Sequence, residues 1–344
     1  MKELTVHAQS GGSRVLVGDF GGDFSRFVPE DKPAVIITDS NVAGIYAERF
    51  PDCPVITTVP GEENKTLGGL EKIYSGLLEC GADRSWFILA VGGGIVCDTA
   101  GFAASTYMRG IDFGFISTTL LANIDASVGG KNGVNFHGYK NIVGVFSQPR
   151  FVVCDVSTLA TLRESDYRCG LAEMIKHGAI RDARHFENIE DNMRGLLKRD
   201  ISTVETLVYE SVSIKAEVVA QDERESGLRK TLNFGHTFAH AIEKVCKLAH
   251  GQAVSVGMCI ASRLSVEMGL LCEDKHQRLK GLIETAGLPV SLHEKASVLA
   301  DAIAGDKKRH GGEIDFILLE DLGKAVIKPI PIARLQEIIR GFEF

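Results

Sequence analysis

Short apolar runs recur along the first half of the chain and predict strands buried on both faces of a parallel sheet. Six such runs, rich in β-branched residues, cover residues 14–18, 34–39, 54–59, 86–93, 112–118 and 151–156. Helical patterns lie between several of them, over residues 41–50, 66–81 and 95–108. Because strands and helices alternate, the pattern predicts crossover units and a doubly wound sheet.

Helical periodicity dominates after about residue 157, over residues 167–180, 202–221, 231–248 and 252–269. One late stretch, residues 313–330, instead predicts a β-hairpin with its turn at Asp321–Gly323. We therefore predict an α/β N-terminal domain with a mostly parallel, Rossmann-like sheet over residues 1–156. A mainly α-helical C-terminal domain follows over residues 157–344. The length of 344 residues also favours two domains, since one hydrophobic core seldom spans so long a chain.

Composition narrows the classes of protein. The net charge of −7 argues against a nucleic-acid partner, because phosphate backbones are bound by basic surfaces. The first residues lack the apolar core of a signal peptide, and no apolar run approaches the roughly 18 residues needed to cross a bilayer. Eight scattered cysteines without a C-x-x-C pair are typical of thiols in a reducing compartment. These features predict a soluble cytoplasmic protein with no membrane partner.

Three consecutive glycines, residues 92–94, separate a predicted strand from a predicted helix. Glycines there let backbone amides approach a pyrophosphate at the helix N-terminus. The spacing is not G-x-G-x-x-G, and a tight structural turn explains the run equally well. Asp39 and Asn41 follow the second strand, and Glu62 and Lys65 follow the third, at the carboxyl edge where open α/β sheets bind ligands. Together these residues favour a dinucleotide crevice, although each alone fits a turn or a solvated helix start.

A polar, glycine-broken stretch over residues 117–141 is too long for a routine connection. Long structured loops in compact domains are usually functional. The stretch offers the side chains of Thr118, Thr119, Asp125, Lys131, Asn135, Lys140 and Asn141. For its lysines, a solvated surface position is the simpler alternative.

Histidines and a carboxylate suggest a metal site in the second half. His236 and His240 lie four residues apart, hence on one helix face, and His250 follows beyond the predicted helix. Upstream, Glu173 and Lys176 share another helix face. Such groups can form a three-ligand catalytic zinc site. Spacing alone nominates His236 and His240 as ligands, although H-x-x-x-H without the adjacent glutamate departs from the metalloprotease pattern.

Lys215, Arg229 and Asn233 precede these histidines. An arginine fork suits a carboxylate or phosphate held by two hydrogen bonds. The alternative is a charged helix face with surface ion pairs, which the DERE run alone would support.

Taken together, the segments from residue 34 to the C-terminal region resemble 3-dehydroquinate synthases. Eight motifs occur in the family's order: GGGIVCDTAGFAASTYMRG, TTLLANIDASVGGKNGVN, YKN, TLRESDYRCGLAEMIKHG, KAEVV, GLRKTLNFGHTFAHAIE, HGQAV and GDKK. The chain departs from the family's usual residues at Cys97, Ser117, Asn132, Arg163 and Gln252.

The resemblance implies a role for each matching residue. Glu173, His236 and His250 match zinc ligands, and His240 matches a substrate-side residue, contrary to the spacing. Positions that match NAD contacts are Asp39, Asn41, Glu62, Lys65, Gly93, Gly94, Asp98, Thr118, Thr119, Lys131, Lys140, Thr161 and Leu162. Those that match substrate or catalytic contacts are Asp125, Lys131, Asn141, Lys176, Lys215, Arg229, Asn233, His240 and Lys307. Arg109 matches a residue that serves a neighbouring subunit's phosphate site, which implies a homodimer.

The resemblance also implies an activity: conversion of 3-deoxy-D-arabino-heptulosonate 7-phosphate, a phosphorylated sugar acid, to 3-dehydroquinate and phosphate in the shikimate pathway. The implied course is transient oxidation by NAD, phosphate elimination, re-reduction and aldol closure, with zinc or cobalt as the metal. Three alternatives stay open. They are a related sugar phosphate cyclase, a glycerol-dehydrogenase-like oxidoreductase, and an inactive NAD-binding or sensor protein.

Overall fold

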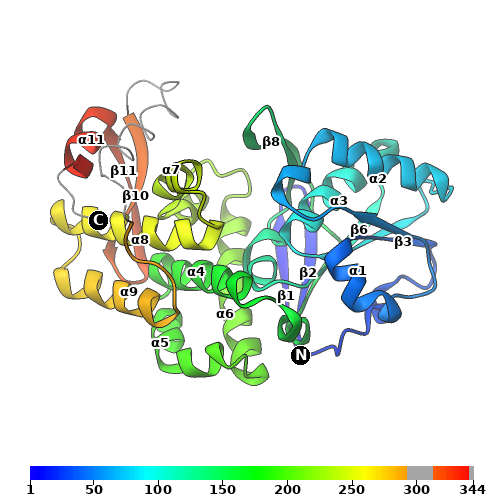
Figure 1. Cartoon of the computed structure of the whole chain (residues 1–344), viewed down its shortest axis with the longest axis horizontal. Coiled ribbons are helices and arrows are strands. Elements are labelled where there is room, and N and C mark those ends of the chain that lie inside the picture. The colour runs from blue at the N-terminus through cyan, green and yellow to red at the C-terminus, as the bar shows by residue number, and fades with distance from the viewer. Residues whose placement is uncertain (293–312, 341–344) are drawn as a thin grey trace. The chain divides into compact units, whose positions relative to one another are not determined.

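A computed structural model describes residues 1–292 and 313–340, and the chain forms two compact units. The first unit comprises residues 1–167 and 199–224, and the second comprises residues 168–198 and 225–344. Figure 1 shows the chain coloured by residue number. The chain thus enters the second unit, returns to the first and leaves it again.

The first unit is built on a seven-stranded sheet of order β1-β2-β9-β6-β5-β3-β4. Its strands are β1 (Lys2–Ala8), β2 (Gly11–Gly18), β3 (Ala34–Asp39), β4 (Val55–Thr58), β5 (Phe87–Gly92), β6 (Asp112–Ser117) and β9 (Phe151–Asp155). All neighbours pair in parallel except β1 and β2. The six predicted strands and the mostly parallel sheet are confirmed. The predicted burial on both faces is wrong for β4, because it lies at the edge of the sheet and none of its four residues is buried. The edge strand β1 was not predicted, because polar and apolar residues alternate along it and it contains no continuous apolar run.

The helices of the first unit are α1 (Ser40–Tyr46), α2 (Leu67–Glu79), α3 (Gly94–Thr106) and α6 (Ile201–Gln221). The first three match the predicted helical stretches. Helix α6 comes late in the chain but packs against β1 and β2. The expected division after residue 156 did not anticipate this return, because periodicity shows that a segment is helical but not which partner covers it.

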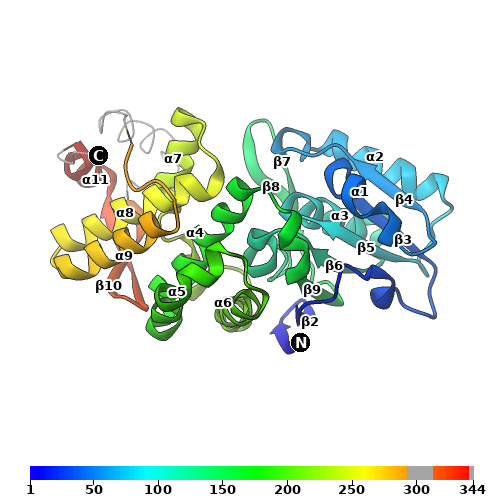
Figure 2. The ribbon, with the colours of Figure 1, turned by 60° about the horizontal axis from the view of Figure 1, so that its bottom comes forward.

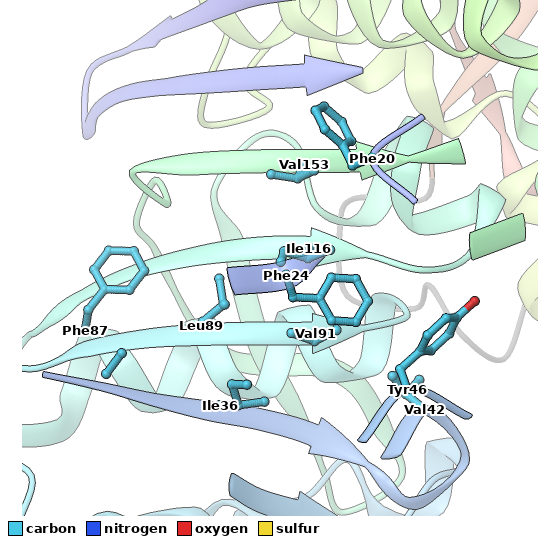
Figure 3. Packing of buried hydrophobic residues seen from close by; sticks show 11 residues of the cluster. Phe20, Phe24, Ile36, Val42, Tyr46, Phe87, Leu89, Val91, Ile116 and Val153 are labelled. Carbon is cyan, nitrogen blue, oxygen red and sulfur yellow. The ribbon is translucent and has the colours of Figure 1, made fainter. Parts of the chain in front are cut away.

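One face of the sheet carries an aromatic and aliphatic core (Figure 3). Ile36 of β3, Leu89 of β5 and Ile116 of β6 lie in this cluster with no accessible surface. Phe24, from the segment between β2 and β3, meets Tyr46 of α1 edge to face, with ring centroids 5.6 Å apart. This packing fixes the strands beneath the loops that follow their carboxyl ends.

The polar stretch predicted as a structured functional loop contains regular secondary structure. It contains a π-helical turn, η5 (Ala122–Ala126), and a hairpin of β7 (Lys131–Phe136) and β8 (Tyr139–Phe146). His137 and Gly138 form the hairpin turn with φ of +48° and +82°, as a two-residue turn requires. The hairpin lacked an alternating apolar pattern because most side chains of β8 are exposed.

The second unit is mainly helical, as predicted. Its helices among the described residues are most of α4 (Glu164–Arg181), α5 (Ala183–Leu197), α7 (His236–Cys246), α8 (His250–Glu267), α9 (Glu273–Thr285) and α11 (Ile332–Arg340). It also contains the hairpin of β10 (Glu313–Asp321) and β11 (Lys324–Pro331). Figure 2 shows these elements from a second direction. The predicted hairpin and its turn are confirmed. The helix expected over residues 231–248 is broken at Gly235, where φ is +80°. Among the described residues, no helix has both the length and the apolarity needed to cross a bilayer.

A buried histidine between α8 and α9 gives a pH-dependent prediction. The Nδ1 atom of His276 lies 2.8 Å from the Ser262 hydroxyl, and burial, helped by nearby Arg263, lowers the pKa of His276 to about 4. The unfolded chain takes up this proton near pH 6.5. The contribution of neutral His276 to stability is therefore present above pH 6.5 and lost as the pH falls towards 4. We expect the melting temperature to fall over this range more steeply in the unchanged protein than in His276→Asn. Parallel curves would contradict this prediction.

Candidate active site

The glycine turn lies against the segment that follows β6. Gly93 caps α3 and Gly94 begins it. A Cβ atom on Gly93 would lie 3.0 Å from Thr119 Cγ2, and one on Gly94 would lie 2.8 Å from Ala126 Cβ. The glycines therefore have a packing reason as well as a chemical one. With no side chains in the way, the first amides of α3 are available to an anion.

Other predicted cofactor residues gather at the same carboxyl edge of the sheet. Asp39 ends β3, where its Oδ1 accepts the backbone N–H groups of Asn41 and Val42 at 2.9 and 3.0 Å and caps α1. Thr161 ends the short helix η6 (Val156–Thr161) after β9, and its hydroxyl lies 2.8 Å from that of Tyr46. Thr118 and Thr119 follow β6, Leu162 follows η6, and Glu62 lies in η3 (Glu62–Asn64) after β4. This is the edge at which open α/β sheets bind ligands.

Lys65 is buried beside this edge and makes two polar contacts. Its Nζ lies 2.5 Å from Asp98 Oδ2 of α3 and 2.5 Å from Asn141 Oδ1 of β8. Burial raises the pKa of Asp98, and the adjacent Lys65 ammonium offsets part of that rise. Residues assigned by resemblance to cofactor and to substrate thus meet in one cluster.

The remaining predicted residues of the first unit have two kinds of position. The Lys215 ammonium, on α6, bonds both the carboxylate and the backbone carbonyl of Asp125. Lys131 and Lys140 are exposed on the hairpin, and Arg109 is exposed in η4 (Tyr107–Arg109).

Glu173, His236 and His250 converge in the second unit. They come from α4 and from the first residues of α7 and α8. The Nε2 atoms of His236 and His250 lie 3.6 and 3.4 Å from Glu173 Oε1, and one ligand atom from each residue lies within 4.8 Å of the others. Lys176 forms an ion pair with Glu173 Oε2. His240 lies outside this group, although its ring centroid is 5.8 Å from that of His236. The structure therefore brings together the trio implied by the resemblance, not the pair favoured by spacing.

The far side of each imidazole is also bonded. His250 Nδ1 lies 2.8 Å from Glu243 Oε1, and His236 Nδ1 lies 3.3 Å from the carbonyl oxygen of Phe234. When Nδ1 carries the hydrogen, the Nε2 lone pair points towards Glu173. Ligand histidines in metal sites have such outer partners. Two imidazole nitrogens and one carboxylate oxygen fit zinc or cobalt with a coordination position left for substrate.

The pKa values of the two histidines are shifted in opposite directions. It lowers the pKa of His236 to about 3, so this imidazole is neutral and its Nε2 can bind a metal. Burial also acts against the charged form of His250, but hydrogen bonds with Glu173 and Glu243 raise its pKa to about 9. A metal ion must therefore displace a proton from His250.

Glycines allow the three helices to approach closely enough for this convergence. A Cβ on Gly251 would lie 2.3 Å from Cys169 Cα of α4. One on Gly257 of α8 would lie 2.2 Å from the carbonyl oxygen of Gly235, the residue before His236. Backbone atoms cannot rotate away as side chains can. Thus α8 contacts α4 beside His250 and contacts the start of α7 beside His236.

Two further predicted residues of the second unit, Arg229 and Asn233, lie in one short helix. Arg229 is buried in η7 (Leu228–Asn233), and Asn233 donates its side-chain N–H to Glu225 Oε1. Glu225 has a left-handed backbone with φ of +60°. Lys307 lies outside the described residues. Sequence reasoning missed Glu225 and Glu243, although Glu243 follows His236 by seven residues and so shares its helix face.

Glu243 gives a direct test of the metal interpretation. Glu243→Gln removes the charge behind His250 but keeps the size of the side chain. We expect the affinity for zinc to fall about 10- to 100-fold, because outer-sphere partners orient the ligand ring and raise its basicity. Competition with a chelator measures this affinity without relying on turnover. Glu267→Gln, at the far end of α8, serves as a control and should leave the affinity unchanged.

Comparison with solved structures places the fold among the sugar phosphate cyclases. The chain is similar to 2-deoxy-scyllo-inosose synthase, solved with carbaglucose-6-phosphate, NAD+ and Co2+, with a TM-score of 0.88 and 26% identity over 98% of this chain and 99% of that one. It is also similar to 2-epi-5-epi-valiolone synthase from Streptomyces hygroscopicus subsp. jinggangensis 5008, solved with NAD+ and Zn2+. Here the TM-score is 0.86 and the identity 27%, over 98% and 96% of the two chains.

Sequence comparison then narrows this class. Residues 55–169 match the model of the 3-dehydroquinate synthase N-terminal domain, and residues 170–309 match that of the C-terminal domain. A 3-dehydroquinate synthase of Halorhodospira halophila (strain DSM 244 / SL1) is 44% identical over 304 residues, which are 86% of this chain and 85% of the relative. The chain belongs to the 3-dehydroquinate synthase family and is an enzyme of this type.

Proposed function

We propose that the chain converts 3-deoxy-D-arabino-heptulosonate 7-phosphate to 3-dehydroquinate and phosphate, in the shikimate pathway of aromatic amino acid biosynthesis. The observation that carries this proposal is the convergence of Glu173, His236 and His250 in a chain of this family. Family membership supports the substrate, and the convergence supports the metal on which the chemistry depends.

We propose that the first unit holds NAD at the carboxyl edge of its sheet. The amides of Gly93 and Gly94 suit the pyrophosphate, since they begin a helix. The other proposed contacts are Asp39, Asn41, Glu62, Lys65, Asp98, Thr118, Thr119, Lys131, Lys140, Thr161 and Leu162. NAD supplies reversible hydride acceptance, which makes the neighbouring substrate proton acidic without net oxidation.

We propose that Glu173, His236 and His250 hold the divalent ion. Lys176 forms an ion pair with Glu173 Oε2, and Glu173 Oε1 faces both imidazoles. The carboxylate therefore presents one oxygen to the ion. Zinc or cobalt there supplies Lewis-acid polarisation of a substrate oxygen. The ion pair with buried Lys176 orients the carboxylate.

We propose that the remaining polar residues bind and orient the substrate. Arg229 suits its carboxylate or phosphate through two parallel hydrogen bonds. The other proposed contacts are Asp125, Lys131, Asn141, Lys176, Lys215, Asn233, His240 and Lys307. The ion pair between Lys215 and Asp125 holds the ammonium in one position. Less side-chain entropy is therefore lost when the substrate binds.

We further propose a homodimer in the cytoplasm. Arg109, proposed to reach the partner's phosphate site, is exposed and follows Met108, and both have left-handed backbones with φ of +70° and +49°. Such strain in non-glycine residues persists where a function requires it. The described structure shows every one of the eight cysteines as a free thiol, which supports a reducing compartment.

The proposed activity has a direct assay. Zinc-loaded protein is incubated with the heptulosonate phosphate and substoichiometric NAD+, and phosphate and 3-dehydroquinate are measured together. We expect equal amounts of both products and no accumulating NADH absorbance. Phosphate release from another sugar phosphate alone would indicate a different cyclase. Accumulating NADH would indicate a dehydrogenase, and NAD binding without turnover an inactive relative.

A further inference from the structure

Asn135 has no assigned role, yet it links two sets of residues with proposed functions. It lies where the register of β7 with β8 shifts: Val134 pairs with Val143, and Phe136 pairs with Tyr139. Residues 140–142 of β8 therefore lie opposite Asn135 alone, so the extra residues of this irregularity are on β8. The Asn135 amide lies between the loop after β4 and the second strand of the hairpin.

One side of Asn135 holds the loop after β4. Its backbone N–H donates to the carbonyl oxygen of Lys65 at 2.8 Å, and Thr66 and Asn135 form an isolated parallel bridge. Its side-chain Nδ2 donates to Glu62 Oε1 at 2.8 Å. Glu62 and Lys65 are proposed NAD contacts. Asn135 therefore positions the carboxylate of Glu62 and the backbone of Lys65.

The other side of Asn135 holds Asn141, a proposed substrate contact. Asn135 Oδ1 accepts the backbone N–H of Asn141 at 2.9 Å. Asn141 has a left-handed backbone with φ of +52°, a conformation that needs local support. Its own Oδ1 accepts from Lys65 Nζ. The contacts therefore close a ring through Glu62, Asn135, Asn141 and Lys65.

The rest of the hairpin is tied together at its base and exposed towards its turn. At the base, Asn132 Nδ2 donates to the carbonyl oxygens of Gly130 and Ser147, which ties the two strand ends together. Towards the turn, Phe136, Tyr139 and Ile142 are exposed. The ring is thus a polar attachment of the distal hairpin to the body of the first unit.

We propose that Asn135 is a positioning residue that couples the binding of NAD to the binding of substrate. The inference rests on the proposed function, because it uses the proposed roles of Glu62, Lys65 and Asn141. A cofactor that orders Glu62 and Lys65 also orders Asn135, which in turn holds Asn141 in its substrate-binding conformation. By linkage, the substrate strengthens NAD binding by the same factor.

The test measures this coupling by calorimetry on the full, zinc-loaded chain. The dissociation constant of NAD+ is measured alone and with a non-cleavable phosphonate analogue of the heptulosonate phosphate. We expect the analogue to tighten NAD+ binding by at least about 5-fold in the unchanged protein, and by less than about 2-fold in Asn135→Ala. Asn192→Ala removes an exposed amide of α5 and should keep the full coupling.

Asn135→Asp separates the two halves of the ring. Its carboxylate still accepts the N–H of Asn141 but repels the carboxylate of Glu62. Hydrogen exchange of the Asn141 amide should stay slow in Asn135→Asp and become fast in Asn135→Ala, with no ligand present. Coupling should be lost in both variants, because each breaks the link to Glu62.

Equal coupling in Asn135→Ala and the unchanged protein would overturn the inference, as would unchanged exchange of the Asn141 amide. Absence of coupling in the unchanged protein would also overturn it. Each of these results is compatible with normal turnover. Failure of the proposed function would instead appear as unchanged protein that binds neither NAD+ nor the analogue, or that releases no phosphate.

Discussion

His250→Ala is expected to abolish phosphate release and to leave the protein unable to retain zinc. The substitution removes one of three converging ligand atoms and leaves Glu173 and His236 to bind the ion alone. Metal ions contribute several kcal/mol of charge stabilisation, so activity should fall on the order of 1,000-fold or more. Zinc content after dialysis and the initial rate of phosphate release measure the two effects.

The fold should survive this change. The side chain of His250 is 35% exposed at the start of α8, so alanine leaves no sealed cavity and favours the helix. His240→Ala is the matched control, because it removes an imidazole one turn from His236 but outside the converging group. It should retain zinc even where it slows turnover. Full zinc content and full activity in His250→Ala would refute the ligand role.

The buried strands could be predicted because each is an almost continuous apolar run. In β5, all six residues are buried, and no polar face interrupts the signal. The hairpin β7–β8 could not be recognised in this way, since most side chains of β8 are exposed and the hairpin is held partly by polar contacts such as those of Asn135. The return of α6 was also hidden, because a helical period does not reveal the partner of a helix.

The metal site shows the same limit at the level of single residues. Spacing identifies residues that share one helix, and so it favoured His236 with His240. The observed partners of His236 lie on two other helices, and nothing local in the sequence measures those distances. Family resemblance supplied the trio because it carries three-dimensional information. The glycines beside His236 and His250 were visible, but their role depends on which backbone each one meets.

Gly251→Ala should therefore damage the metal site although it touches no ligand. The added Cβ would lie 2.3 Å from Cys169 Cα and 2.5 Å from its carbonyl oxygen, so α8 must move away from α4 and carry His250 away from Glu173. We expect a loss of roughly 1–3 kcal/mol in stability. A displacement near 1 Å should also cost about 100-fold in turnover. Gly281→Ala makes the same change in α9, where nothing lies within 4 Å, and should stabilise the protein by roughly 0.5–1 kcal/mol. The melting temperature should therefore fall in Gly251→Ala and rise in Gly281→Ala. Zinc affinity and turnover should fall in Gly251→Ala only. If Gly251→Ala behaved like Gly281→Ala, close approach of α8 and α4 would not be what positions His250.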